Sequence, residues 1–381
     1  MDAAISDPAQ LLESARALYP KLRERASQVE AARKISPDSF QEMKEAGLFR
    51  MTQPKAYGGA QLPYHVFCEA VMEIAQGCPS TGWIYAVIGE HNVTLGAYYP
   101  RQAQDDVWAE APDTYIGSGN SPELVYTEQD DGWLVNGQLR FSSGCEFVTW
   151  HMTGGRINGR PGRILFPQAG NEIIDSWNSM SLAGTGSHDV KLNNVRLPDH
   201  RICFDAGPGP WFNDTPLYRQ PQWSTGPFCL AAAVVGAGQG ALRLFIDMVS
   251  GRNAKFGAKV AEFQSIQLRI AEAAAELDAA RRMILGDLRE THEVLESADE
   301  MPVEMRARNL RDMAFAPVLA KRAVDRLFYA SGAESLDLGG DLQRYYRDVN
   351  AGAQQICLNW DANGTVFGRI ALGMEPGPVR W

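Results

Sequence analysis

The sequence has few cysteines and no paired cysteine motif. Its six cysteines are scattered without a Cys-x-x-Cys spacing, which argues against a zinc site or a disulfide framework and favours buried thiols. Basic residues are also in deficit, since 36 Lys and Arg stand against 46 Asp and Glu for a formal net charge of −10. The chain therefore lacks the positive field expected of a nucleic-acid-binding protein.

Long apolar runs are missing as well. No stretch of about 18 apolar residues occurs, so we expect no transmembrane helix. The segment Met1–Asp7 is acidic and has neither the basic start nor the apolar run of a signal peptide, so we expect a cytoplasmic protein. With 381 residues and 45% hydrophobic content, the chain can bury a large core divided over two or three domains.

Two short polar loops are the most informative feature that is present. The first reads Phe141-Ser142-Ser143-Gly144-Cys145, and the second runs from Ser181 to Val190 as SLAGTGSHDV. Glycine lets a backbone approach a flat ligand closely, and Ser and Thr supply hydrogen-bonding hydroxyls. The loops could equally be ordinary turns, in which Ser and Gly are common. The interpretation that uses both loops is a planar polar cofactor held between a β-rich and a helical domain.

The hydrophobic pattern changes period twice along the chain. Apolar residues recur at helical spacing in the first third and again in the last part, and we expect helices over 11–22, 37–47, 64–76, 80–98, 231–248, 261–289, 305–331 and 342–372. Between Tyr115 and Ile202 short alternating runs predict strands, with Asp131-Gly132 and Asn136-Gly137 as hairpin turns. The segment 190–198 reads as a further strand pair.

This order of helices, strands and helices predicts an α+β fold. We divide it into an N-terminal helical domain over 1–112, a central antiparallel β-barrel or β-sandwich over 113–205, and a C-terminal helical bundle over 206–381.

Several segments in shared order and spacing resemble the acyl-CoA dehydrogenase superfamily over nearly the whole chain. They are Ser80-Thr81-Gly82-Trp83, residues 131–137, residues 177–198, Arg252 with Phe256-Gly257 and Gln264, and residues 344–348. The resemblance implies an N-terminal helical domain, a β-domain and a C-terminal four-helix bundle, with flavin between the last two. It also implies a homotetramer.

The chain departs from the dehydrogenases where they commonly carry their catalytic glutamate. The comparable region, 347–361, contains no glutamate, and an amide such as Gln has no titratable proton acceptor to replace it. The chain is more similar to the oxygenase components of two-component flavin-dependent monooxygenases, such as p-hydroxyphenylacetate, dibenzothiophene and indole oxygenases. The shared features are Phe141–Gly144, Gly184–Ser187 and the pair Glu90-His91.

This resemblance implies a defined chemistry. A separate NAD(P)H-dependent reductase supplies reduced FAD or FMN as diffusible flavin. The flavin reacts with O₂ to a C4a-hydroperoxyflavin, which hydroxylates or epoxidises an electron-rich phenol, indole or polycyclic aromatic. Such a site must be dry and must hold flavin N5 by a hydrogen bond.

The resemblance also assigns candidate roles in cofactor binding. Ser143, with backbone N–H groups near Gly144, is the candidate partner of flavin N5, and Thr185 and Ser187 would contact the ring edge or the phosphate chain. We expect His188 to be a surface residue beside the site. The remaining cofactor-binding candidates are Ser142, Arg252 for phosphate, and Phe256 and Gln264 along the flavin, where Phe256 could also be plain core packing.

His91 is the candidate catalytic residue. It lies in an otherwise apolar predicted helix, and histidine can deprotonate a phenol or hydrogen-bond to an indole near neutral pH. The alternative is a satisfied buried histidine without a catalytic role. Trp83 would be an aromatic wall of the substrate pocket or simply part of the core.

One departure bears on the substrate. Many phenol-hydroxylating relatives carry a second histidine in the last helical segment, whereas this chain has Asn350, Gln354 and Gln355 there and no histidine after His292. Our hypothesis is therefore a substrate that is already nucleophilic, such as indole, oriented by Asn350 or Gln354. Two other functions remain open: an acyl-CoA dehydrogenase or oxidase with a displaced base, and a flavin-free scaffold or binding protein.

Overall fold

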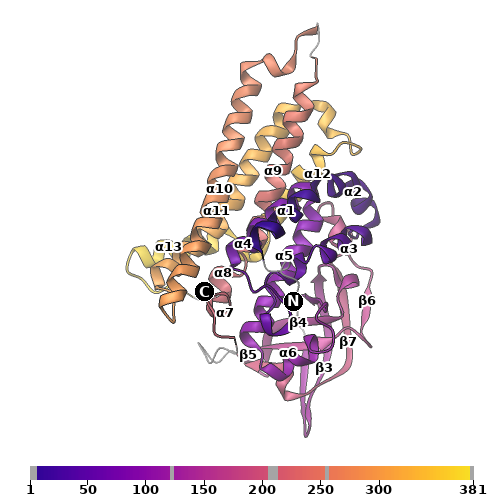
Figure 1. Cartoon of the computed structure of the whole chain (residues 1–381), viewed down its shortest axis with the longest axis vertical. Coiled ribbons are helices and arrows are strands. Elements are labelled where there is room, and N and C mark those ends of the chain that lie inside the picture. Colours follow the sequence, from indigo (N-terminus) through magenta and orange to yellow (C-terminus); the bar gives the residue numbers. More distant parts are fainter. Residues whose placement is uncertain (1–6, 121–123, 205–212, 254–256, 378–381) are drawn as a thin grey trace.

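The computed structural model describes residues 7–120, 124–204, 213–253 and 257–377, and it confirms the predicted order of helices, strands and helices (Figure 1). The N-terminal part is helical. Its helices are α1 (Pro8–Ala17), α2 (Tyr19–Ala32), α3 (Pro37–Glu45), α4 (Tyr64–Gly77), α5 (Pro79–Tyr98) and α6 (Arg101–Trp108).

Helix α5 is the central element of this domain. It begins with Pro79 in its first turn, where proline needs no hydrogen-bond partner for its nitrogen. Apart from two intermediate positions near its middle and its last residue, the helix is buried, and Glu90 is its only charged residue. A lone carboxylate in such a helix requires polar partners, because burying an unpaired charge is costly.

The middle of the chain forms two four-stranded sheets stacked as a sandwich. One sheet has the order β1-β4-β5-β8 and the other β2-β3-β7-β6, and every pair is antiparallel except β1 with β4, which is parallel. The strands are β1 (Ile116–Ser118), β2 (Val125–Gln129), β3 (Gly132–Ser142), β4 (Trp150–Ile157), β5 (Arg160–Pro167), β6 (Glu172–Ile174), β7 (His188–Leu197) and β8 (Ile202–Phe204).

The first sheet is covered on both faces. One face packs on the second sheet, for example through Phe166 against Val190 in one buried cluster. The other face packs on α5 and α6, where Met152 joins Leu95 and Trp108 in another cluster. Alternate residues of β4 therefore point either into the sandwich or towards the N-terminal helices.

Two of the predicted turns have different outcomes. Asp131-Gly132 lies at the β2–β3 hairpin, as expected. Asn136-Gly137 is not a turn: it lies inside β3, where the register with β7 shifts between Val135 and Gly137. An Asn-Gly pair suits a bulge as well as a turn, because glycine accepts the positive φ of 135° found at Gly137. Residues 190–198 are likewise not a strand pair, since β7 runs continuously through them to Leu197.

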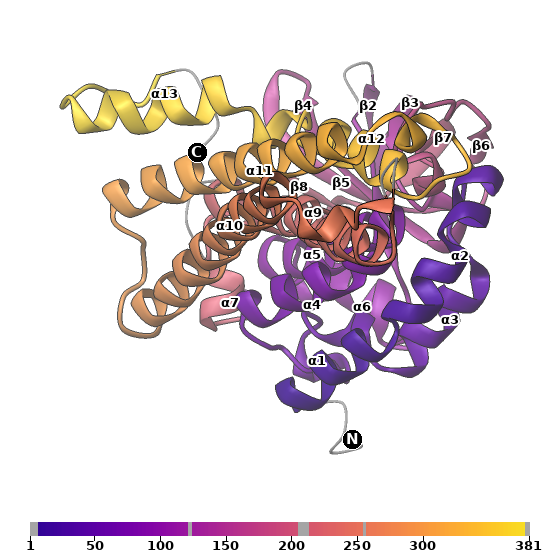
Figure 2. The same cartoon turned by 90° about the horizontal axis from the view of Figure 1, so that it is seen from above.

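The C-terminal part is dominated by long helices around α9, seen from above in Figure 2. Its helices are α7 (Pro216–Arg219), α8 (Gln222–Thr225), α9 (Phe228–Ser250), α10 (Gln264–Ser297), α11 (Val303–Ser331), α12 (Leu342–Gly352) and α13 (Trp360–Ala371). The prediction of a single helix over 342–372 is wrong, because two helices occupy this segment. Helix α12 ends at Gly352, and Asn359 caps the start of α13 by accepting a hydrogen bond from the N–H of Ala362 at 2.9 Å.

Helix α9 owes its apolar composition to its central position. The segment 222–250 is long and apolar enough to cross a membrane by those two criteria, but 78% of its most apolar window is buried inside the structure. Gly236 and Gly240 bring α9 against α4: a Cβ atom there would lie 2.4 Å from the carbonyl oxygen of Met72 and 2.3 Å from that of Gln76. Glycine at both positions thus permits backbone-to-backbone packing.

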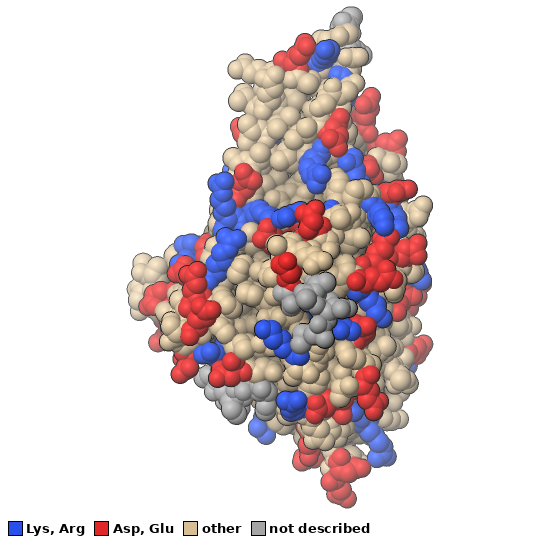
Figure 3. Space-filling model, viewed as in Figure 1, with Lys and Arg blue, Asp and Glu red and all other residues tan. Residues whose placement is uncertain are grey.

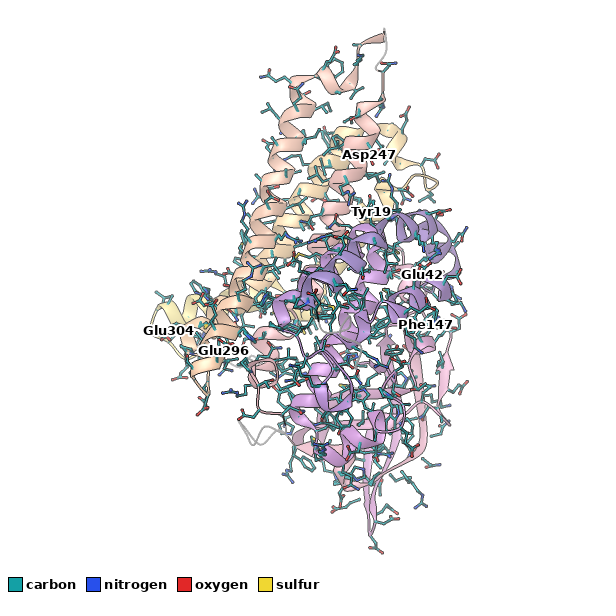
Figure 4. The ribbon with its side chains drawn as sticks, viewed as in Figure 1. Tyr19, Glu42, Phe147, Asp247, Glu296 and Glu304 are labelled. Atoms are coloured by element: carbon teal, nitrogen blue, oxygen red, sulfur yellow. The ribbon has the colours of Figure 1, made fainter. Side chains whose placement is uncertain are left out.

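Aromatic contacts join the N-terminal helices to the β-domain. The ring of Phe40 on α3 stacks on Phe147 with centroids 4.9 Å apart and meets Tyr115 edge-on at 5.2 Å. Figure 4 marks Phe147 just below Glu42 of α3. On the surface, acidic and basic side chains are interspersed, without a dominant patch of one sign on the face shown in Figure 3.

Candidate active site

The structure brings the two polar loops together, as the sequence analysis expected. The hydroxyls of Ser143 and Ser187 lie 2.8 Å apart, and that of Ser187 is also 2.7 Å from the Thr185 hydroxyl. The N–H of Gly144 donates to the carbonyl of Thr185 at 2.8 Å. Thr185 and Ser187 are buried, whereas Ser143 is partly exposed. Ser143 is thus the hydroxyl of this network that is open to a ligand.

The glycines of the second loop face a helix. A Cβ atom on Gly184 would lie 2.2 Å from Cγ1 of Val29 on α2, and one on Gly186 would lie 2.9 Å from the carbonyl oxygen of Arg33. In the structure these glycines make room for the C-terminal end of α2 and the residue that follows it, and the close approach of a flat ligand to them stays a prediction. They let the loop pack against α2, which fixes it relative to the N-terminal domain.

Each loop contains a non-glycine residue in the left-handed region. Phe141 has φ of 61° and Leu182 has φ of 47°, a conformation that L-residues rarely adopt and that clusters at functional sites. The N–H of Leu182 donates to Oδ1 of Asp348 on α12 at 2.5 Å. Burial raises the pKa of the Asp348 carboxyl to about 7. Through this bond the C-terminal bundle holds the second loop.

Position 188 differs from the expectation. His188 is buried rather than on the surface, because it begins β7 beneath the loop. Its Nδ1 accepts a hydrogen bond from the N–H of Trp177 at 3.2 Å and lies 3.4 Å from Oδ1 of Asp175. These contacts give His188 a structural role in connecting the two ends of the 175–187 loop.

His91 lines a separate cavity of about 600 Å³ between α5, the β4–β5 hairpin and α8. Nδ1 of His91 lies 2.6 Å from the carbonyl oxygen of Ile116. A carbonyl can only accept, so Nδ1 carries the proton and the neutral ring has its lone pair on Nε2. Burial lowers the pKa of His91, although the neighbouring Glu90 opposes this effect. His91 is therefore a buried neutral base beside a cavity.

The cavity wall mixes polar and aromatic groups. Ser118, Asn120, Arg163, Gln222 and Trp223 all contribute to the lining. Its volume lies within the range of about 300–1,000 Å³ typical of ligand pockets. Ser142, Ser143, Gly144, Thr185 and Ser187 are not among the lining residues, so the cavity and the loop network are adjacent but distinct.

A polar chain runs along one wall of the cavity to Glu90. Arg163 donates to Oε1 of Gln222 at 2.5 Å, and Nε2 of Gln222 donates to the hydroxyl of Thr94 at 2.9 Å. That hydroxyl donates to Oε1 of Glu90 at 2.7 Å. Oε2 of Glu90 lies 4.0 Å from Nε2 of His91. The guanidinium of Arg163 is thus connected to the partly buried carboxylate of Glu90 through two neutral side chains.

Strand β1 and its neighbour β4 connect the cavity with the loops. Ile116 holds His91, Gly117 is paired with His151, and Ser118 lines the cavity. His151 is fully buried, its Nδ1 lies 3.4 Å from the hydroxyl of Ser142, and burial lowers its pKa to about 4. Ile116 and Gly117, which are consecutive residues of β1, therefore contact His91 and pair with His151. His91 is the candidate base, and His151 supports the Ser143 loop.

Arg252 and Gln264, two of the remaining candidates, are not among the residues that line the cavity. Arg252 donates to the carbonyl of Ser331 at 2.6 Å and pairs with Glu334 at 3.2 Å. Gln264 is exposed at the start of α10, and Phe256 lies outside the described residues. Their predicted contacts with flavin stay predictions.

The three substrate candidates are placed differently. Trp83 is buried and touches α12, where a Cβ atom on Gly352 would lie 3.4 Å from its ring. Asn350 donates to Oδ1 of Asp325 at 3.1 Å and to a carbonyl of its own helix, while Gln354 is exposed. A substrate contact of these residues stays a prediction.

Sequence reasoning missed several cavity residues. Gln222 and Arg163 come from distant segments whose approach to α5 is a tertiary event. Outside the cavity wall, His151 behind the Ser143 loop was also missed, because it belongs to no motif. Glu90 did carry a signal, because it is the only charged residue of α5.

Comparison with known proteins decides the family. Residues 7–108 match the model of the acyl-CoA dehydrogenase N-terminal domain, and residues 228–360 match that of the C-terminal domain. The oxygenase subunit HsaA of a flavin-dependent monooxygenase from Rhodococcus jostii is 38% identical over 94% of this chain and 97% of its own. The chain belongs to this family of flavin-dependent monooxygenase oxygenase components.

Two further relatives agree with this assignment. The oxygenase component of an FADH(2)-dependent resorcinol hydroxylase from a Rhizobium species is 34% identical over 93% of this chain and 92% of its own. The crystal structure of 3-HSA hydroxylase from Rhodococcus sp. RHA1 superimposes with a TM-score of 0.90 at 34% identity, covering 96% of this chain and 97% of the other. An enzyme is thereby favoured over a flavin-free scaffold or binding protein.

Proposed function

We propose that this flavin-dependent monooxygenase component hydroxylates an aromatic substrate bound in the cavity beside His91. The observation that carries the proposal is the His91 ring itself, whose Nδ1 is fixed by Ile116 and whose Nε2 is left as the basic atom beside the cavity. A neutral imidazole in this state can accept a proton from an aromatic hydroxyl.

The residues of the two loops fit a flavin in their chemistry. Ser143 offers a hydroxyl fixed by Ser187, and the N–H of Gly144 is held in place by Thr185. We propose that Ser143 binds flavin N5, and that the buried hydroxyls behind it hold Ser143 in position. Bound reduced flavin supplies the activation of O₂; the chain supplies orientation, exclusion of water and the proton acceptor.

The supply of flavin and the assembly extend this proposal. We propose FADH₂ as the reduced flavin, delivered as diffusible flavin by a separate NAD(P)H-dependent reductase, because the resorcinol relative is named FADH(2)-dependent. We also propose a cytoplasmic homotetramer. In support, the C-terminal helices expose large apolar side chains, among them Leu268 and Tyr329, which are 53% and 91% exposed.

One observation favours a second candidate. Glu90 places a carboxylate at the cavity, which is what an acyl-CoA dehydrogenase with a displaced base would need. The two functions separate under anaerobic conditions: a dehydrogenase bleaches its bound FAD when acyl-CoA is added, whereas the proposed monooxygenase does not.

The direct test is stopped-flow mixing of protein and reduced FAD with oxygenated buffer. We expect a long-lived species that absorbs in the near ultraviolet before flavin is reoxidised, and hydroxylated product when resorcinol is present. The His91→Ala variant should keep this species and lose most product. Immediate reoxidation with no product from the unmodified protein would refute the proposal.

A further inference from the structure

The search for further function leads to Glu90, which the proposed mechanism leaves unused. It is a partly buried carboxylate on an otherwise uncharged helix. Its Oε1 accepts the Thr94 hydroxyl, and its Oε2 faces Nε2 of His91 at 4.0 Å. Among the ion pairs of the described residues, Glu90 has one partner, His91, which becomes cationic only when its ring is protonated.

The geometry suits the protonated form of His91. In the neutral ring, Nε2 carries a lone pair and has nothing to donate to Glu90, which agrees with a separation longer than a hydrogen bond. Once Nε2 takes a proton, the ring becomes an imidazolium with an N–H beside a carboxylate. The pair then attracts strongly, because the Coulomb energy of two charges at 4 Å is large away from bulk water.

The polar chain behind Glu90 prepares it for this role. From Arg163 through Gln222 and Thr94 to Glu90, every hydrogen bond donates in the same direction. Such a chain polarises cooperatively and stabilises the negative charge at its end. Gly226 leaves the space, since a Cβ atom there would lie 3.2 Å from Oε1 of Glu90.

We propose that Glu90 is a positioning residue that stabilises the His91 imidazolium formed when a substrate hydroxyl is deprotonated. The O–H bond of the substrate breaks, the proton moves to Nε2 of His91, and the electron pair stays on the substrate oxygen as a phenolate. The inference rests on the proposed function and deepens it, because it assigns hydroxylated aromatics as the substrate class. It reverses the expectation drawn from the missing second histidine.

Other titratable groups also face His91 or Glu90 from the packed elements. They are His151 and Arg156 on β4, Arg163 on β5, Tyr64 on α4 and Cys229 on α9. Of these groups, burial lowers the pKa of His151 and raises those of Tyr64 and Cys229, which favours the neutral form of all three. Glu90 is therefore the negative charge whose removal should change the proton affinity of His91.

The first test needs neither flavin nor turnover. The protein holds six histidines, so ring-¹⁵N-labelled histidine gives a resolvable set of NMR titrations, with His91→Asn identifying the signal of His91. In Glu90→Gln, we expect the affinity of His91 for a proton to fall about tenfold or more. Glu90→Asp should restore part of it. An unchanged titration in a folded Glu90→Gln protein would overturn the proposal.

The second test uses turnover and the chain behind Glu90. In Glu90→Gln, single-turnover hydroxylation of resorcinol should be slower. The fall in its rate on acidification should also move to lower pH, because His91 then binds a proton less tightly. Thr94→Val removes the hydroxyl that holds Glu90 and should behave similarly but more weakly, while Thr94→Ser keeps the hydroxyl and serves as the matched control. Equal pH profiles in all variants would refute the inference, whereas no product from the unmodified protein would refute the proposed function instead.

Discussion

Replacing Gly184 with alanine tests whether the second loop packs on a helix or on a ligand. The new Cβ atom would lie 2.2 Å from Cγ1 of Val29 and 3.1 Å from both Cβ of Ser80 and the carbonyl oxygen of Val29. Gly184 does not have a positive φ, so the effect is steric and not a backbone strain. Overpacking of this kind costs about 1–3 kcal/mol, and we expect that loss in the free energy of unfolding.

A double-mutant cycle identifies the contact. Val29 is 3% exposed, and Val29→Ala alone should cost roughly 1.6 kcal/mol for its two methyl groups. Because it also removes the clashing atom, the double variant should be more stable than the sum of the single effects by about 1 kcal/mol.

The cycle is measured by urea unfolding, together with the affinity for reduced FAD. Gly286→Ala is the control, since a Cβ atom there meets nothing within 4 Å and alanine in a helix stabilises by about 0.5–1 kcal/mol. Strictly additive effects would refute the contact with Val29. A large loss of flavin affinity at unchanged stability would return Gly184 to the ligand-facing role expected from the sequence.

Three further outcomes follow from the site. Ser143→Ala should cost about 0.5–1.5 kcal/mol through the lost bond to Ser187 and should raise the yield of H₂O₂ per turnover, measured with peroxidase coupling. Asp348→Asn should flatten the pH dependence of stability: the folded pKa of about 7 exceeds the unfolded value of 3.8, so this group makes stability fall as pH rises from about 4 to 7. The amide oxygen of Asn at position 348 can still accept the hydrogen bond from the N–H of Leu182, so the variant should stay folded. Thermal unfolding at a series of pH values measures the flattening. Arg163→Met should weaken resorcinol turnover by removing the cation at the start of the chain to Glu90.

Much of the fold could be predicted from local sequence. Helices with a strong apolar period were predictable because burial of one face dominates their stability. The continuous β7 and the bulge at Gly137 were not, since turn-forming pairs such as Asn-Gly fit a bulge equally well and only the register with the neighbouring strand decides. The break between α12 and α13 depends on the cap formed by Asn359, and the apolar pattern alone continues past it.

The candidate site was predictable in part. Hydroxyls on two loops suggested a joint network, and Ser143 and Ser187 do meet. What lies beside the Cα of a glycine depends on the tertiary structure and not on local sequence. The sequence therefore suggested a ligand beside Gly184, whereas the structure places Val29 there. The chain from Arg163 to Glu90 joins residues 73 positions apart, through a third segment that carries Gln222, and no spacing along the sequence encodes such an approach.

The alternation of β4 has a consequence for how this enzyme can change. Its His151 supports the Ser143 loop from inside the sandwich, while the next residue, Met152, lines the cavity from the opposite face. Substitutions on the cavity face, and in the β4–β5 hairpin that continues it, can therefore reshape which molecules enter without disturbing the serine loop. Under the proposed function, substrate range and oxygen handling are therefore separable traits, and a library confined to the β4–β5 hairpin would diversify the first while preserving the second.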